Sequence, residues 1–107
     1  MSTQISVIIP NFNGLNLLPD CLNSLVKQTL TNFEIILVDN HSKDRSLEYI
    51  KSNFKKVRIV RLNKNYGFAK AINEGVKKSK SKYVVFLNND TKVDRSYLKN
   101  LVRCADL

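Results

Sequence analysis

Three short apolar runs in this chain of 107 residues each end in side chains that can bind a ligand. The run at 84–87 is followed by two amides and a carboxylate, and the runs at 7–9 and 35–38 also end in polar, turn-forming residues. Any one of these polar residues could instead cap a helix or form a turn, but three such endings together favour a binding site. The polar residues concerned are Asn11, Asn13, Asp39, Asn40, Asn88, Asn89 and Asp90.

The apolar runs are too short for helices and predict strands. The run at 84–87 lacks polar alternation, which is typical of a strand covered on both faces, as in a parallel sheet. Residues 57–62 alternate more, as expected for a strand nearer the edge of the sheet. In parallel sheets ligands bind beyond the carboxyl ends of the strands, which is where Asp90 is expected to lie.

Apolar residues at helical spacing separate these strands. Cys21 falls on the apolar stripe of the first expected helix, and the third is expected to carry Phe68, Ile72 and Val76 on one face. The expected helices cover about 15–28, 47–54, 68–78 and 97–102, with Asp44 or Ser46 capping the second and Asp94 the fourth.

Strands that alternate with helices through short loops predict an α/β fold. We expect one domain over residues 1–107, with a three-layer, doubly wound and mostly parallel sheet of about four strands and helices on both faces, similar to a Rossmann fold. The strand order 3-2-1-4, which is assumed from this fold class, reverses direction between the first and the fourth strand. That reversal would open a crevice between residues 11–13 and 88–90.

Several common phosphate and nucleotide sites do not fit the sequence. The first strand is followed by Asn13-Gly14 rather than by Gly-x-Gly-x-x-Gly, and Walker-type phosphate binding fails too. A phospho-accepting receiver domain would use Asp39 and Asp90 at strand ends. Such domains typically need an acidic pair after the first strand, where this chain has Pro10 and Asn11.

No apolar stretch approaches the roughly 20 residues of a membrane span, and the first residues lack the pattern of a signal peptide. The protein is therefore expected to be cytoplasmic, with a place at the cytoplasmic face of the membrane left open for a longer protein. Cys21 and Cys104 lie far apart without a Cys-x-x-Cys spacing, so a zinc site is not expected.

The positive charge of the chain is concentrated in one region. Residues 51–82 contain eleven Lys or Arg and a single acidic residue, Glu74, in a chain whose net charge is +9. This region could be a solvated face that keeps the protein soluble, or it could attract a phosphorylated ligand, an anionic membrane or nucleic acid. A non-catalytic basic binding module is therefore an alternative function. Nucleic acid is the less favoured partner, because aromatic residues are sparse in this region and no recognised motif accompanies them.

The order of four motifs resembles the nucleotide-sugar-dependent glycosyltransferases of family 2, which have the GT-A fold. The resemblance covers nearly all of residues 5–104. The motifs are Val7-Ile8-Ile9-Pro10-Asn11-Phe12-Asn13, Val38-Asp39-Asn40-His41-Ser42-Lys43-Asp44, Asn65-Tyr66-Gly67-Phe68-Ala69 with Asn73 and Gly75, and Leu87-Asn88-Asn89-Asp90.

The resemblance implies a site for a UDP-sugar or dTDP-sugar and a divalent cation, Mg²⁺ or Mn²⁺. Asp39 would accept the imide N–H of a pyrimidine, Phe12 would cover its ring, and Asp90 would bind the metal that bridges the diphosphate. The implied nucleotide-binding residues are Pro10, Asn11, Phe12, Asn13, Asp39, Asn40, Asn65, Gly67, Asn88 and Asn89, and the implied metal ligand is Asp90.

The sequence departs from the usual family pattern at the metal motif. The common Asp-x-Asp is replaced by Asn88-Asn89-Asp90, so the metal would be held more weakly or would rely on phosphate and water oxygens. Asn40 replaces a second aspartate, which hints at dTDP-sugars over UDP-sugars, and His41 stands where glycine is common.

The resemblance further implies inverting transfer of a sugar to a saccharide or lipid-linked acceptor, as in cell-surface polysaccharide biosynthesis. The acceptor-binding half and the catalytic base of the family would follow Leu107, and the acids after Asp90 fit a helix cap, Asp94, and a chain-end residue, Asp106. We therefore expect a nucleotide-binding half that is inactive alone and contains no catalytic residue. Apolar surface that a second half would cover could lead to self-association.

Overall fold

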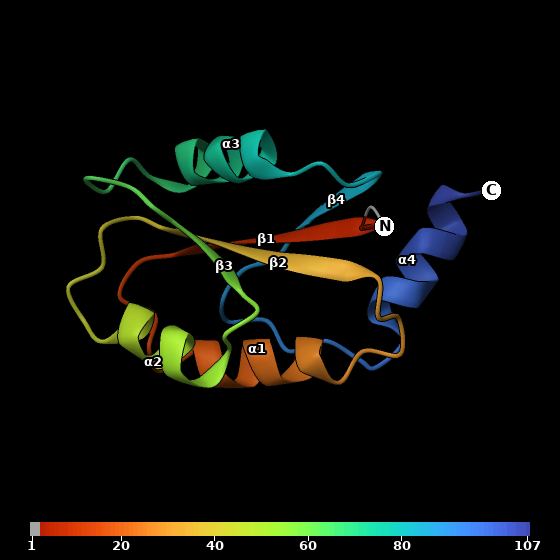
Figure 1. Cartoon of the computed structure of the whole chain (residues 1–107), viewed down its shortest axis with the longest axis horizontal. Helices are drawn as coiled ribbons and strands as arrows, with labels where there is room; N and C mark the ends of the chain where they lie inside the picture. Colours follow the sequence, from red (N-terminus) through yellow and green to blue (C-terminus); the bar gives the residue numbers. More distant parts are fainter. Residues whose placement is uncertain (1–2) are drawn as a thin grey trace.

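Four strands and four helices alternate along the chain (Figure 1), and the computed structural model describes residues 3–107. No helix in the described part of the chain is long and apolar enough to cross a membrane. In chain order the elements are β1 (Ile5–Asn11), α1 (Leu18–Val26), β2 (Phe33–Asp39), α2 (Ser46–Asn53), β3 (Arg58–Arg61), α3 (Phe68–Lys78), β4 (Tyr83–Phe86) and α4 (Tyr97–Ala105).

The strands form one parallel sheet in the order β3-β2-β1-β4, which confirms the predicted order 3-2-1-4. Figure 1 shows α3 on one face of the sheet and α1 and α2 on the other. The start of α4 is tied to the segment that follows α1, because the side-chain oxygen of Gln28 accepts a hydrogen bond from the Leu98 N–H at 3.0 Å. These contacts confirm a three-layer, doubly wound fold.

The two central strands are apolar on both sides because helices cover both faces. On one face Ile8 of β1 and Ile36 of β2 pack against Ala71 and Ile72 of α3. On the other face residues such as Val7 belong to a larger cluster formed with α1, α2 and α4. The continuous apolar runs of β1 and β2 therefore correspond to strands buried on both faces.

The prediction that the run at 84–87 is covered on both faces is wrong for two of its residues. Val84 is 37% exposed and Phe86 is 54% exposed, whereas Leu87 is buried. β4 lies at the edge of the sheet, and α3 packs over β1 and β2, so the side chains of β4 on the α3 side are uncovered. This exposed apolar strip is consistent with self-association, which stays a prediction.

The predicted apolar face of α3 is also partly wrong. Phe68 and Val76 are exposed, and the buried positions of the helix are Ala71, Ile72 and Gly75. The small residues at 71 and 75 let the helix backbone approach the sheet closely, which turns the larger side chains at either end toward solvent. Phe68 is thereby free to take part in the site described below.

Hydrogen-bonded turns precede the first, second and fourth helices. The expected helix at 15–28 is shorter in the structure, because the N–H groups of Leu17 and Leu18 first bond to the Gly14 carbonyl in a turn. The prediction that Asp44 or Ser46 caps α2 is wrong, because the N-cap residue is Arg45 and no side chain caps the helix; Asp44 instead accepts hydrogen bonds from the N–H and hydroxyl of Ser46 in the turn before it. The predicted cap at Asp94 is also wrong, because the N-cap residue of α4 is Ser96; Asp94 accepts from the N–H of Ser96 in the turn before the helix.

Gly75 marks the closest approach of α3 to the sheet. A Cβ at this position would lie 2.5 Å from Ile8 Cγ2 and 3.1 Å from Val38 Cγ2. Both neighbours are fully buried side chains of central strands, so they have little room to move.

We therefore expect Gly75→Ala to lower the free energy of unfolding by about 1–3 kcal/mol, despite the better helix propensity of alanine. Urea unfolding followed by circular dichroism measures this change. Asn73→Ala, at an exposed position of the same helix, is the control and should not destabilise the protein. A Gly75→Ala variant as stable as the original would show that α3 does not pack this closely.

Candidate functional site

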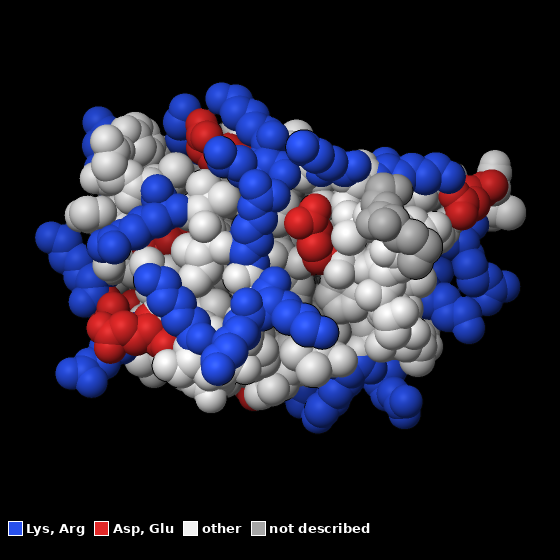
Figure 2. Space-filling view, in the orientation of Figure 1, with Lys and Arg blue, Asp and Glu red and all other residues white. Residues whose placement is uncertain are grey.

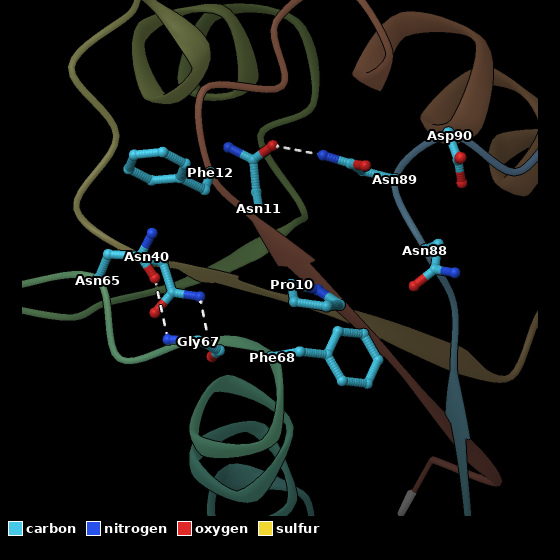
Figure 3. A pocket seen from close by; sticks show the side chains of 10 residues that line it. All are labelled: Pro10, Asn11, Phe12, Asn40, Asn65, Gly67, Phe68, Asn88, Asn89 and Asp90. Carbon is cyan, nitrogen blue, oxygen red and sulfur yellow. Dashed lines mark hydrogen bonds between the residues drawn. The ribbon is translucent and has the colours of Figure 1, made fainter.

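A cavity of about 360 Å³ opens at the carboxyl ends of the strands, at the reversal between β1 and β4 (Figure 3). This volume lies in the range typical of small-molecule sites. Nine of the eleven residues predicted for the site line it, together with Phe68; Asn13 and Asp39 are not in its lining. The lining residues are Pro10, Asn11, Phe12, Asn40, Asn65, Gly67, Phe68, Asn88, Asn89 and Asp90.

The Asn11 side chain joins three segments beneath the cavity. Its amide nitrogen donates to Asp39 Oδ1 at 3.0 Å and to Ser42 Oγ at 3.3 Å. Its amide oxygen accepts from the Asn89 amide at 2.9 Å, a bond drawn in Figure 3. Asn11 is buried and pairs in register with Asp39, so these bonds fix the end of β1 to the end of β2 and to the loop after β4.

Asp39 lies under the cavity rather than in its wall. Its carboxylate is fully buried, and Oδ1 accepts from Asn11 and from the Ser42 hydroxyl at 2.6 Å. Oδ2 accepts from the Ser42 N–H at 2.8 Å. A buried carboxylate needs such donors to offset its lost hydration. Asp39 therefore positions Asn11 and the turn at Ser42, and its direct contact with a nucleobase stays a prediction.

Asn13 also uses its side chain within the protein. Its amide oxygen accepts from the N–H groups of Lys43 at 2.8 Å and Asp44 at 3.3 Å, which ties the loop after β1 to the loop after β2. Asp44 continues this link, because its carboxylate also accepts from the Leu15 N–H at 3.1 Å. Desolvation acts to raise the pKa of Asp44, but hydrogen bonds from Ser46 and Leu15 outweigh it and keep that pKa below its usual value.

Asn40 holds the loop between β3 and α3 against the cavity. Its amide nitrogen donates to the Gly67 carbonyl at 3.2 Å, and its amide oxygen accepts from the Tyr66 N–H at 3.2 Å. Within that loop the Asn65 side-chain oxygen accepts from the Gly67 N–H at 2.9 Å. These bonds fix one wall of the cavity, as Figure 3 shows for Asn40 and Gly67.

Two exposed aromatic rings flank Pro10 in the cavity. Phe12 is 47% exposed and Phe68 is 56% exposed, and Figure 3 shows their rings on opposite sides of Pro10. Phe68 was not predicted as a site residue, because helical spacing assigned it to a buried face. Its position directly after Gly67, within the third motif, is the sequence signal that could have identified it.

The loop after β4 contributes three residues with oxygen-bearing side chains. Asp90 is exposed, and the Asn89 amide nitrogen is bound to Asn11, which leaves the Asn89 amide oxygen available. No group of three or more His, Cys, Asp or Glu within residues 3–107 could hold a metal. One carboxylate with the amide oxygens of Asn88 and Asn89 suits Mg²⁺ or Mn²⁺, provided that phosphate and water oxygens complete the coordination.

Two further residues shape this end of the sheet. A Cβ on Gly14 would collide with the Asn89 amide nitrogen and the Asn11 amide oxygen, so a larger residue at this position would have to displace one of these two amides. Cys21 lies under the same loop, with its thiol 3.8 Å from the Asn88 carbonyl oxygen. Burial, and then the charge of Asp90, raises the pKa of Cys21 to about 11. The thiol is therefore protonated at neutral pH.

His41 is held in a strained backbone conformation next to this network. Its φ angle is 67°, in the left-handed region, and its buried Nδ1 has no hydrogen-bond partner among the described residues. A residue with a Cβ in this conformation costs roughly 1–2 kcal/mol, and an unpaired buried nitrogen adds to that cost.

We expect His41→Gly to be more stable than His41→Ala by about 1 kcal/mol, because only glycine relieves the left-handed strain. The two variants both remove the imidazole, so their difference in urea unfolding reports the backbone alone. An alanine variant as stable as the glycine variant would contradict the strained conformation of His41.

Comparison with solved structures shows that the fold is that of GT-A glycosyltransferases. TarS from S. aureus superposes with a TM-score of 0.90 and 28% sequence identity, over 97% of this chain and 32% of TarS. TarS in complex with UDP-GlcNAc gives a TM-score of 0.90 over 31% of its chain. The mannosyltransferase PcManGT from Pyrobaculum calidifontis, at 21% identity and a TM-score of 0.84 over 96% of this chain and 32% of PcManGT, shares the fold.

Sequence comparison leads to the same class. The poly(ribitol-phosphate) beta-N-acetylglucosaminyltransferase TarP of Staphylococcus aureus is 38% identical over 103 residues, which are 92% of this chain and 32% of TarP. The uncharacterized glycosyltransferase EpsJ of Bacillus subtilis is 32% identical over 108 residues, 99% of this chain and 31% of EpsJ. The chain thus spans about a third of the length of these relatives.

A profile of Glycosyl transferase family 2 matches residues 6–106. The chain belongs to glycosyl transferase family 2.

Proposed function

We propose that the cavity binds a pyrimidine nucleotide sugar, the donor for glycosyl transfer. The observation that carries this proposal is the presence, in one cavity, of two exposed aromatic rings and a cluster of amide and carboxylate oxygens. Phe12 and Phe68 present apolar surface to a base or a sugar, and Asp90 presents a charged oxygen to a metal-bound diphosphate. The relative TarS has been solved with UDP and with UDP-GlcNAc, which supports a UDP-sugar as the donor. A dTDP-sugar is the alternative donor, suggested by the amide at Asn40.

A divalent cation, Mg²⁺ or Mn²⁺, is part of this proposal. Asp90 would bind it, with the amide oxygens of Asn88 and Asn89 as further ligands. When bound, the ion supplies Lewis-acid stabilisation of the charge that develops on the departing nucleoside diphosphate. Asn11 accepts a hydrogen bond of 2.9 Å from the Asn89 amide, so the Asn89 side chain is already oriented before the donor binds.

The remaining residues are proposed to orient the donor. Asn40 and Gly67 support the wall along the nucleotide, and Asp39 keeps Asn11 in place. A rigid arrangement of this kind lowers the entropic cost of binding. Direct acceptance of a base imide proton by Asp39 is the prediction from sequence, and Asp39→Asn with a UDP titration tests it.

Transfer itself is proposed for the longer protein of this family. The name of TarP, a poly(ribitol-phosphate) beta-N-acetylglucosaminyltransferase, supports a polymer as the acceptor. A saccharide or lipid-linked acceptor, a role in cell-surface polysaccharide biosynthesis at the cytoplasmic face of the membrane, and inversion at the sugar carbon are proposed from the sequence resemblance. In this chain the carboxylates after Asp90 accept hydrogen bonds from other residues of the protein. Asp94 accepts from Ser96, and hydrogen bonds from Tyr83 and Lys82 hold the pKa of Asp106 below its usual value. We therefore expect the 107-residue chain to bind the donor without transferring the sugar.

Calorimetric titration with UDP and dTDP, with and without Mn²⁺, tests the proposal. We expect Mn²⁺ to increase the affinity for UDP or dTDP. In Asp90→Asn the affinity measured with Mn²⁺ should be at least about tenfold lower than in the original protein, because the only carboxylate of the cluster is lost. Binding without the metal should change little.

Asp20→Asn, at an exposed carboxylate on α1, is the matched control and should titrate like the original protein. GDP and ADP serve as tests of base selectivity. The proposal is wrong if no pyrimidine diphosphate binds. The metal assignment is wrong if the effect of Mn²⁺ survives in Asp90→Asn.

A further inference from the structure

A broad basic surface lies on the side of the molecule formed by β3, α3 and the end of α2. Figure 2 looks onto this side and shows Lys and Arg side chains spread across it rather than gathered in one groove. All eleven cationic side chains between residues 51 and 82 are exposed. This basic surface consists of Lys51, Lys55, Lys56, Arg58, Arg61, Lys64, Lys70, Lys77, Lys78, Lys80 and Lys82.

Most of this charge is not neutralised within the protein. Glu74 pairs with Lys70 at 3.0 Å and with Lys77 at 3.4 Å, and Asp106 pairs with Lys82 at 3.2 Å. The other eight cations of the surface form no ion pair within residues 3–107. Arg58 donates to the Lys78 carbonyl at 3.0 Å, which brings the end of α3 to β3 and concentrates the charge further.

We infer that the basic surface docks this protein on an anionic lipid bilayer. Nine of its eleven cations are lysines, which act as hydrated point charges and suit diffuse attraction to lipid headgroups. A cluster of this size exceeds the four to eight cations that typically recognise anionic lipids.

The aromatic residues of the region argue against a nucleic-acid strand as the partner. Proteins that bind single strands stack bases on free aromatic rings along a groove. Phe54 packs instead against the Tyr49 ring, with centroids 5.8 Å apart. The Tyr66 ring is already covered by the ammonium groups of Lys64 and Lys70, at 4.9 and 5.8 Å. Phe68 lines the donor cavity.

The basic surface reaches the rim of the cavity. Lys64 and Lys70 lie over Tyr66, whose N–H donates to Asn40 in the cavity wall. Docking through this surface would bring the cavity rim close to the headgroups. If the donor site is as proposed above, this placement favours an acceptor that is carried on a lipid.

Sedimentation with vesicles of phosphatidylcholine, with and without 30% phosphatidylglycerol, tests the docking surface. We expect binding only to the anionic vesicles, and weaker binding as NaCl rises from about 50 to 150 mM. The quadruple variant Lys51→Gln, Lys55→Gln, Lys56→Gln, Lys78→Gln should bind the anionic vesicles at least about tenfold more weakly, since each lysine near a membrane contributes roughly fivefold to the affinity.

A second quadruple variant, Lys27→Gln, Lys43→Gln, Lys92→Gln, Lys99→Gln, has the same net charge as the first variant but keeps the basic surface. It should lose less than about threefold, because the changed lysines lie outside that surface. Equal losses in both variants would mean that net charge, and not this surface, attracts the vesicles and would overturn the inference. Circular dichroism and urea unfolding confirm that both variants are folded.

Two further outcomes would overturn the inference. One is equal binding to neutral and anionic vesicles. The other is retention of an oligonucleotide at 150 mM NaCl, lost in the first variant, without any vesicle binding, which would assign the surface to nucleic acid. A UDP titration of the first variant separates the two proposals, because its four lysines do not line the cavity. Vesicle binding without UDP binding would refute the donor site and leave the docking surface standing.

Discussion

The buried side-chain amide of Asn11 is the interaction on which the rest of the site depends. It bonds to Asp39 and Ser42 on one side and to Asn89 on the other, so one side chain connects the ends of β1 and β2 and the loop after β4. A buried carboxylate without donors would be costly, and a buried amide that lost its partners would be costly too. The strand ends are therefore held together because each of these buried polar side chains needs the others as hydrogen-bond partners. Gly14 belongs to the same constraint, because any side chain there would enter the Asn11–Asn89 contact.

This network separates residues that build the site from residues that are free to bind. The side chains of Asp39, Asn13 and Asn40 form hydrogen bonds within the protein, to Asn11 and the turn at Ser42, to the loop after β2 and to the loop before α3, respectively. The exposed carboxylate of Asp90 and the exposed rings of Phe12 and Phe68 face the cavity instead. The arrangement resembles preorganised sites in general, where internally satisfied groups fix the position of a few groups that meet the ligand.

The sequence predicts the fold well, because the spacing of apolar residues and the polar strand endings are local signals. These signals indicate the fold class, from which the strand order and the crevice are assumed, and most of the lining follows from them and from one resemblance. The sequence cannot show which polar atoms are already paired, since Asn11, a partner of Asp39, and the partners of the Asn13 side chain come from other segments of the chain. The run at 84–87 has the composition of a central strand, yet its exposure is decided by where α3 packs. Phe68 escaped prediction for a similar reason, because the contact stripe of α3 follows Ala71 and Gly75 rather than the large side chains.

The measurement that tests the central claim most directly is UDP affinity in Asn11→Ala, taken together with its free energy of unfolding. Removing the amide leaves Asp39 and Asn89 without a shared partner, which should cost about 1–3 kcal/mol in stability. If the network positions the site, UDP should also bind at least about tenfold more weakly at temperatures where the variant is fully folded. A variant that is less stable but binds UDP with unchanged affinity would contradict the account, because the amide would then support the fold alone.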